Sequence, residues 1–146
     1  MKVKYEEDKT IHGVEVKIRA PMLDDEVLEI IASLKAKDKK IIGIKDNSST
    51  ILELRDIYYF DSVDKKTFIY CENDVYETSL KLYELEESLA AFGFVRTSKQ
   101  QVLNLDKVES IQPESSSRLR LKLENGEIVV VSRQYAPIIK AKLFQQ

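Results

Sequence analysis

The sequence is poor in the residues that form most catalytic and metal sites. It contains one cysteine, Cys71, and one histidine, His12. A single cysteine excludes a disulfide within the chain and a cysteine-rich zinc site. With only 4 glycines, the chain also lacks a glycine-rich phosphate loop and a Gly-x-Ser-x-Gly nucleophile motif. We therefore expect no enzyme activity and no cofactor.

Long apolar runs are absent as well. The longest stretch without a charged residue runs from Ser88 to Val95, whereas a membrane-spanning helix needs about 20 predominantly apolar residues. Residues 1–8 lack the apolar run of a secretory signal. The sequence therefore predicts a cytoplasmic protein. Its 43% apolar and 33% charged residues are typical of a folded chain.

Pairs of acidic residues are the remaining enzymatic possibility. Asp61 with Asp64, or Glu84 with Glu87, could serve as acid and base in a small hydrolase. Such pairs more often cap turns or line a solvated helix face. We therefore rank a hydrolase last among the candidate functions.

The first third of the chain is expected to form a strand, a helix and two short strands. Apolar and charged residues alternate over 14–18, which is the period of a half-buried strand. Residues 23–35 place apolar side chains at helical spacing and predict an amphipathic helix. Short β-like runs follow at 41–44 and 50–54, separated by turn residues 46–49.

The remainder is dominated by closely spaced strands. We expect them at 57–60, 68–71, 75–78, 94–96, 102–105, 108–112, 119–123 and 127–131. A second helix is expected to be capped by Ser79 and to end at Gly93, and Ser132 is expected to cap a third. Asn125-Gly126 favours a type I′ hairpin turn, in which both central residues have positive φ.

Charge is unevenly distributed along the chain, although its net value is only −2. Residues 46–92 carry 11 acidic and 4 basic side chains, whereas residues 93–146 carry 9 basic and 5 acidic ones. A locally basic binding face is therefore compatible with a weakly acidic protein.

The basic residues supply the candidate binding groups. Lys65 and Lys66 lie on a short turn between two expected strands. The segment 96–101 combines cations, hydroxyls and amides, which are the groups that contact phosphates and base edges in DNA. Three cations alternate with leucines over 118–123. Arg133 is expected at a helix start, where its charge opposes the helix dipole. Taken singly, most such residues are merely solvated.

Six segments are informative because of their order. They are Asp56–Ser62, Ser79–Glu86, Phe94–Lys99, Val102–Asn104, Asn125–Gly126 and Val131–Tyr135. This ordered set resembles the LytTR family of bacterial DNA-binding domains, and the resemblance covers about residues 44–146. It implies a mainly β fold of stacked antiparallel sheets with flanking helices. Loops, rather than a recognition helix, would enter the DNA grooves, and the protein would regulate transcription.

The resemblance also implies three DNA-contacting loops. The residues that it assigns to them are Lys65, Lys66 and Thr67, then Ser98, Lys99 and Gln100, and finally Arg133. Many family members carry a His-Arg or His-Asn dipeptide where this sequence has Ser98-Lys99, so a relative's DNA site cannot be transferred to this chain. Arg96 and Asn104 match positions that are expected to fix the turn between them.

The resemblance leaves the role of residues 1–43 open. They are too few for a response-regulator receiver, so it points to stand-alone members, which are often encoded beside small membrane proteins that restrain them. We expect residues 1–43 either to pack on the 44–146 domain or to form a surface for dimerisation or for an inhibitory partner. Two copies are expected to bind repeated half-sites in double-stranded DNA. The alternative is a protein-interaction module whose DNA-binding surface has decayed.

Overall fold

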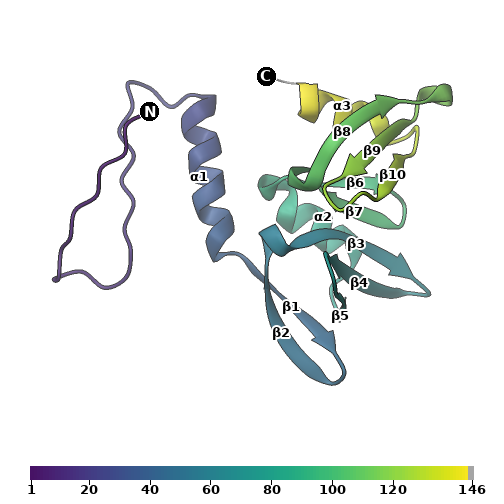
Figure 1. Cartoon of the computed structure of the whole chain (residues 1–146), viewed down its shortest axis with the longest axis horizontal. Coiled ribbons are helices and arrows are strands. Elements are labelled where there is room, and N and C mark those ends of the chain that lie inside the picture. The colour runs from purple at the N-terminus through teal and green to yellow at the C-terminus, as the bar shows by residue number, and fades with distance from the viewer. Residues whose placement is uncertain (145–146) are drawn as a thin grey trace.

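Two antiparallel sheets and three α-helices form the framework of the protein, seen in a computed structural model (Figure 1). The structure describes residues 1–144, apart from the side chains of residues 36–38. The elements are α1 (Asp25–Asp38), β1 (Lys40–Lys45), β2 (Ser48–Glu53), β3 (Ile57–Val63), β4 (Lys66–Cys71), β5 (Val75–Thr78), α2 (Leu82–Leu89), β6 (Phe94–Ser98), β7 (Gln101–Asn104), β8 (Val108–Pro113), β9 (Leu119–Leu123), β10 (Ile128–Val131) and α3 (Ala136–Phe144). The short 3₁₀ helices are η1 (Leu54–Asp56), η2 (Ala90–Phe92), η3 (Leu105–Lys107) and η4 (Ser115–Ser117).

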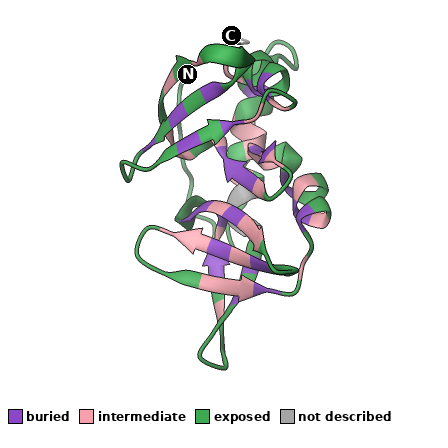
Figure 2. Cartoon of the chain, turned by 90° about the vertical axis from the view of Figure 1, so that its right-hand side faces the viewer, coloured by how far each residue is buried: buried purple, intermediate pink, exposed green. Residues whose placement is uncertain are grey.

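The larger sheet has seven strands in the order β2-β1-β5-β4-β3-β7-β6, and the smaller has three in the order β10-β9-β8. Neighbouring strands are antiparallel throughout. The mainly β fold class with flanking helices is therefore confirmed. Figure 2 shows buried and exposed residues alternating along the strands, as the two-residue period of a strand requires.

Type I′ turns are present, but not at the predicted hairpin. Asp46–Asn47 and Asp64–Lys65 both have positive φ and join paired strands as two-residue loops. Between β9 and β10 only Gly126 has positive φ, and its N–H donates to the carbonyl of Leu123 at 2.9 Å. This is a type I turn followed by a left-handed glycine, so the hairpin was predicted correctly and its type I′ geometry was not.

The predicted strand at 14–18 is not formed. Residues 1–24 contain neither helix nor strand, and Val14 and Val16 are 92% and 59% exposed. An alternating sequence forms a strand only where another strand accepts its backbone hydrogen bonds. In the part of the chain that the structure describes, this segment has no such neighbour. It lies beyond α1, away from the sheets (Figure 1).

The helix predicted at 23–35 is confirmed. It begins where Asp24 accepts a hydrogen bond from the Val27 N–H at 3.1 Å. Val27 is buried, and the helix contacts η2. A hollow of about 460 Å³ separates it from residues 1–4 and 16–21. The helix therefore bridges the N-terminal segment and the body of the domain.

The other two helices start later than predicted. α2 is entered through Lys81, whose N–H donates to the Glu84 carboxylate at 3.2 Å, so Ser79 is not its cap. α3 begins at Ala136, whose N–H donates to the Ser132 carbonyl at 3.0 Å. Arg133 therefore lies in the turn before α3 and not in its first helical turn. Gly93, with φ of 86°, ends η2 and confirms the predicted stop.

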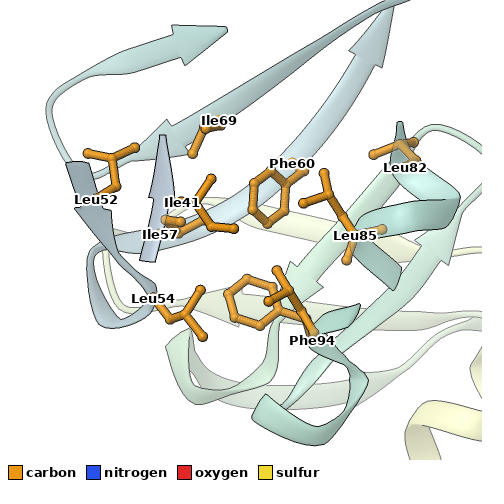
Figure 3. Packing of buried hydrophobic residues seen from close by; sticks show 11 residues of the cluster. Ile41, Leu52, Leu54, Ile57, Phe60, Ile69, Leu82, Leu85 and Phe94 are labelled. Atoms are coloured by element: carbon orange, nitrogen blue, oxygen red, sulfur yellow. The ribbon is translucent and has the colours of Figure 1, made fainter. Parts of the chain in front are cut away.

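One core lies between the larger sheet and α2. Figure 3 shows side chains from the strands, such as Phe60 and Phe94, meeting Leu85 of α2. Phe60 and Leu85 have no solvent exposure, and the two phenylalanine rings lie 5.7 Å apart. Burial of these aromatic and leucine side chains removes a large apolar area from water and anchors α2 on the sheet.

A second core lies between the smaller sheet, α3 and the β3-β7-β6 end of the larger sheet. The leucines of β9 at 119, 121 and 123 face this core together with Leu103 and Ile139. β6 and β7 lie between the two cores, because Phe94 and Val102 belong to the first core while Val95 and Leu103 belong to the second. Both faces of these two strands are thus held by packing.

Gly43 is required by the close approach of β1 to its neighbours. A Cβ at this position would lie 2.7 Å from the Tyr76 Cβ and 2.9 Å from the Leu52 Cδ1. Gly43→Ala should lower the free energy of unfolding by about 1–3 kcal/mol, the usual cost of overpacking. Ile42→Ala is the matched control, since Ile42 is 57% exposed and its loss should cost less than about 1 kcal/mol. Chemical denaturation measures both variants; equal losses would contradict the steric argument.

Candidate nucleic-acid interface

Backbone hydrogen bonds bring the three predicted loops to one end of the domain. The β6–β7 turn contains Ser98, Lys99 and Gln100, and the Gln100 carbonyl accepts from the Ser62 N–H of β3 at 2.8 Å. On its other side, the Thr97 carbonyl accepts from the Ser132 N–H at 3.1 Å. The β6–β7 turn therefore lies between the β3–β4 turn and the segment that carries Arg133.

The β3–β4 turn presents two lysines. Lys65 occupies the second turn position, with φ of 68°, and Lys66 begins β4 opposite Val63. Both lysines are exposed. Thr67 differs, because it lies between Ser62 and Thr78 in the sheet and is only 4% exposed. The exposed surface of this loop is therefore cationic, and we leave Thr67 out of the interface proposed below.

The Arg96 guanidinium holds the β6–β7 turn in place. Its Nη1 donates to the Lys99 carbonyl at 2.8 Å, and its Nη2 lies 3.2 Å from a carboxylate oxygen of Glu86 in α2. The Gln100 N–H donates to the Ser98 hydroxyl at 3.2 Å within the turn. With the turn backbone held in this way, the exposed Lys99 and Gln100 side chains project from a defined position.

Asn104 holds the far end of β7. It is 2% exposed, its amide donates to the Ile57 carbonyl at 2.9 Å, and its side-chain oxygen accepts from the Asp106 N–H at 3.0 Å. The expectation that Arg96 fixes the β6–β7 turn is therefore confirmed. For Asn104 it was wrong, because Asn104 bonds to the start of β3 and to η3 at the opposite end of the hairpin.

Arg133 lies beside the second loop across a shallow hollow of about 430 Å³. The lining residues are Ser98, Lys99, Gln100, Ser132, Arg133 and Gln134. Lys99 and Arg133 are both exposed. Among the described residues, neither these two nor Lys65 and Lys66 lie within 4.0 Å of an acidic side chain. Their charges are therefore available to an anionic ligand.

Acidic groups near this end are few. Asp61 pairs with Gln101 on the neighbouring strand, and its burial raises the pKa of its carboxyl, opposed by a hydrogen bond from the Ser62 N–H. A carboxyl with a raised pKa is more readily neutralised when a phosphate approaches. Asp64 lies exposed in the β3–β4 turn. A third acid, Glu86, is paired with Arg96 beside the β6–β7 turn.

A separate cationic strip runs along β9. Arg118, Arg120 and Lys122 are exposed while the intervening leucines are buried, as their alternation predicted. Arg120 lies 3.6 Å from Glu114, which lowers the net charge of this strip. Sequence reasoning therefore identified two basic surfaces, and only the three-loop end combines unpaired cations from several elements.

Other site types find little support in the described part of the chain. No group of three metal-ligating side chains occurs among those residues. None of its helices is long and apolar enough to span a membrane. Cys71 is half-buried, and burial raises the pKa of its thiol to about 11, so the thiol is protonated at neutral pH.

Comparison with known proteins gives consistent results. The LytTr DNA-binding domain model matches residues 47–144. HTH-type transcriptional regulators from Staphylococcus aureus strains NCTC 8325 and MRSA252 are 29% and 28% identical over 130 residues, covering 88% of this chain and 88% of each relative. A LytTr DNA-binding domain of a methyl-accepting/DNA response regulator from Bacillus cereus superposes with a TM-score of 0.68 and 25% identity, covering 72% of this chain and 96% of that one.

The fold and its exposed cations define a mainly β DNA-binding module that presents loops. The chain belongs to the LytTr DNA-binding domain family, and it is a bacterial DNA-binding transcription regulator. The names of the staphylococcal relatives include "HTH-type". In the described part of this chain, strands separate each α-helix from the next, so no helix-turn-helix unit is formed.

The role of Arg96 in positioning the second loop can be measured. Arg96→Ala removes the bond to the Lys99 carbonyl and should lower the free energy of unfolding by about 1.5–3 kcal/mol, the range for hydrogen bonds from a charged group. It should also speed amide hydrogen exchange at Gln100 and Ser62. Glu86→Gln is the control, because it removes the ion pair and keeps the Lys99 bond. Equal acceleration of exchange in both variants would show that the ion pair, not the carbonyl bond, holds the turn.

Proposed function

We propose that this protein binds double-stranded DNA sequence-specifically in the bacterial cytoplasm through its three-loop end, with no enzyme activity and no cofactor. The observation that carries the proposal is the convergence of Lys65, Lys66, Lys99 and Arg133 from three loops that backbone hydrogen bonds hold side by side. Cations spaced over several loops match the dense negative charge of a duplex.

The side-chain chemistry assigns a different part to each loop. Arg133 carries a planar guanidinium, which can donate two parallel hydrogen bonds to a guanine in the major groove. Ser98 and Gln100 offer a hydroxyl and an amide that can contact base edges or phosphates. Lys65 and Lys66 are flexible point charges and suit phosphate oxygens, which fix position on the duplex without reading its sequence.

We further propose that two copies act together on repeated half-sites. A single domain of this size contacts too few base pairs to distinguish its site from the many competing sites of a genome. Doubling the site supplies the missing selectivity. Residues 1–43 are the proposed source of the contact between copies, and a small membrane protein that restrains the regulator is a further proposed partner of this segment.

The test of the main proposal is a salt-dependent binding titration on the promoter of the protein's own gene. Tight binding that falls steeply as salt rises, with selectivity over unrelated DNA, supports a DNA-reading loop surface. Absence of selective binding at low salt would instead favour a protein-interaction module with a decayed DNA surface.

Arg133→Ala tests base reading by the third loop. If the guanidinium contacts a guanine bidentately, the variant should lose about 1–3 kcal/mol of specific binding and discriminate less at one position of the site. Arg55→Ala is the control, because Arg55 is an exposed cation of η1, where it pairs with Glu53 and not with the loops. Unchanged affinity and base preference for Arg133→Ala would remove Arg133 from the interface.

Lys65→Ala and Lys66→Ala test phosphate contact by the first loop. Each variant should bind all DNA sequences more weakly and reduce the magnitude of the salt slope by about 0.9 per lost phosphate contact. Anisotropy titrations at several salt concentrations give both quantities. A loss confined to the specific site, with an unchanged slope, would show instead that these lysines read bases.

A further inference from the structure

Residues 14–18 have the sequence of a strand and lack a strand to pair with. Val14, Val16 and Ile18 alternate with Glu15 and Lys17, and the first two are 92% and 59% exposed. The segment has no strand neighbour within the described residues. Its backbone groups are open to a partner and so is Val14, whereas Val16 and the half-buried Ile18 line the hollow beside α1.

In the described part of the chain, the β2 edge of the larger sheet lacks a strand neighbour on one side. β2 is the terminal strand of that sheet and pairs with β1 on one side only, so its other edge offers backbone donors and acceptors. Ile51 of β2 is 67% exposed and lies opposite Ile42 of β1, which is 57% exposed, and Ile44 is 42% exposed. We call these three residues the isoleucine face. An exposed edge strand with an apolar face is a site for strand addition.

The two surfaces match in length and in period. β2 has six residues, and the alternating segment extends to Arg19. When Val16 is placed beside Ile51, the two-residue period puts Val14, Val16 and Ile18 on the side of the isoleucine face, whichever way the strand runs. Glu15 and Lys17, which alternate with these apolar residues, then project from the opposite face of the added strand.

The helix α1 keeps these two surfaces apart within one chain. It has 14 residues and is therefore about 21 Å long. Its last residue is followed closely by β1, while its first residue follows the N-terminal segment. Figure 1 shows the segment on the side of α1 that faces away from β1 and β2. The β2 edge of one copy can therefore accept the N-terminal segment of a second copy while α1 of the accepting copy stays in contact with η2.

We propose that two copies of this chain form a dimer by exchanging strands: residues 14–18 of each copy add to the β2 edge of the other, where their apolar side chains lie beside Ile51 and extend its isoleucine face. Each copy donates one strand and accepts one, so the assembly closes with two-fold symmetry. The dimer deepens the proposed function, because it provides the contact between two copies on repeated half-sites. Its formation does not require DNA.

Disulfide trapping with two differently sized chains tests this pairing. Both chains carry Cys71→Ala, which removes the native thiol; one then carries Val16→Cys and the other Ile51→Cys. Both added thiols replace exposed side chains, so folding should be preserved. Mixing under oxidising conditions should give a mixed disulfide, because opposed strand residues lie within disulfide distance. Lys17→Cys mixed with Ile51→Cys should give far less, since residue 17 points to the other side of the added strand.

Three outcomes would overturn the proposal. The first is the absence of the mixed disulfide. The second is a disulfide that forms only within a single chain carrying both cysteines, which would mean that the segment adds to its own sheet. The third is a predominant disulfide between two Val16→Cys chains, which would mean that two N-terminal segments pair with each other.

Light scattering without DNA separates this proposal from the proposed DNA function. The full chain should be a dimer; Val16→Glu and Ile51→Glu should each shift it to a monomer, and the control Lys17→Glu should leave it a dimer. The affinity of Val16→Glu for a single half-site should stay within about twofold of the unchanged chain. If the unmodified chain is a monomer, only the dimer proposal is wrong. If the unmodified chain does not bind a half-site, only the DNA-binding proposal is wrong.

Discussion

The turn between β6 and β7 is bonded to the segments around it, and the arrangement of the proposed DNA-binding end depends on those bonds. Its carbonyls accept from Ser62 of β3, from Ser132 after β10 and from the Arg96 guanidinium. The bonds from Ser62 and Ser132 join the turn to distant parts of the sequence, and the Arg96 bond holds it from within β6. Cations that lie far apart along the chain thereby acquire fixed relative positions, while their side chains remain free to meet a ligand.

Packing keeps this turn in place. β6 and β7 present Phe94 and Val102 to one core and Val95 and Leu103 to the other. A one-residue slip would move Phe94 and Val102 into the second core and Val95 and Leu103 into the first. Each close-packed core would then have to accept side chains of a different size and shape. Register is therefore strongly specified where the loops begin, which is the condition that precise recognition of DNA places on a loop-based interface.

Electrostatics at this end contrast with the charge of the whole protein. The net charge is −2, yet the exposed side chains of the three loops are mainly cationic. Part of the acidic middle third lies in α2, where Glu86 faces Arg96 and Glu84 accepts from the helix N-terminus. These acids stabilise the scaffold instead of opposing the ligand, so local potential, not net charge, governs attraction of a polyanion.

The sequence by itself determined the secondary structure wherever periodicity and turn residues agreed. The alternation of β9, the stripe of α1 and the glycine at 93 each follow from side-chain spacing or backbone freedom, which are local properties. The ordered motifs also indicated the family and the residues of its three loops. The helix starts at Leu82 and Ala136 were missed because capping bonds depend on nearby backbone geometry.

Only the tertiary structure decided which of those residues share a surface. It buried Thr67 between two strands, gave Arg96 its carbonyl and carboxylate partners, and placed Arg133 beside Lys99. It also left residues 14–18 unpaired, although their pattern is that of a strand. The physical reason is the same in each case: burial and hydrogen bonding at these positions depend on segments distant in sequence, and a local pattern carries no information about which segment will be adjacent.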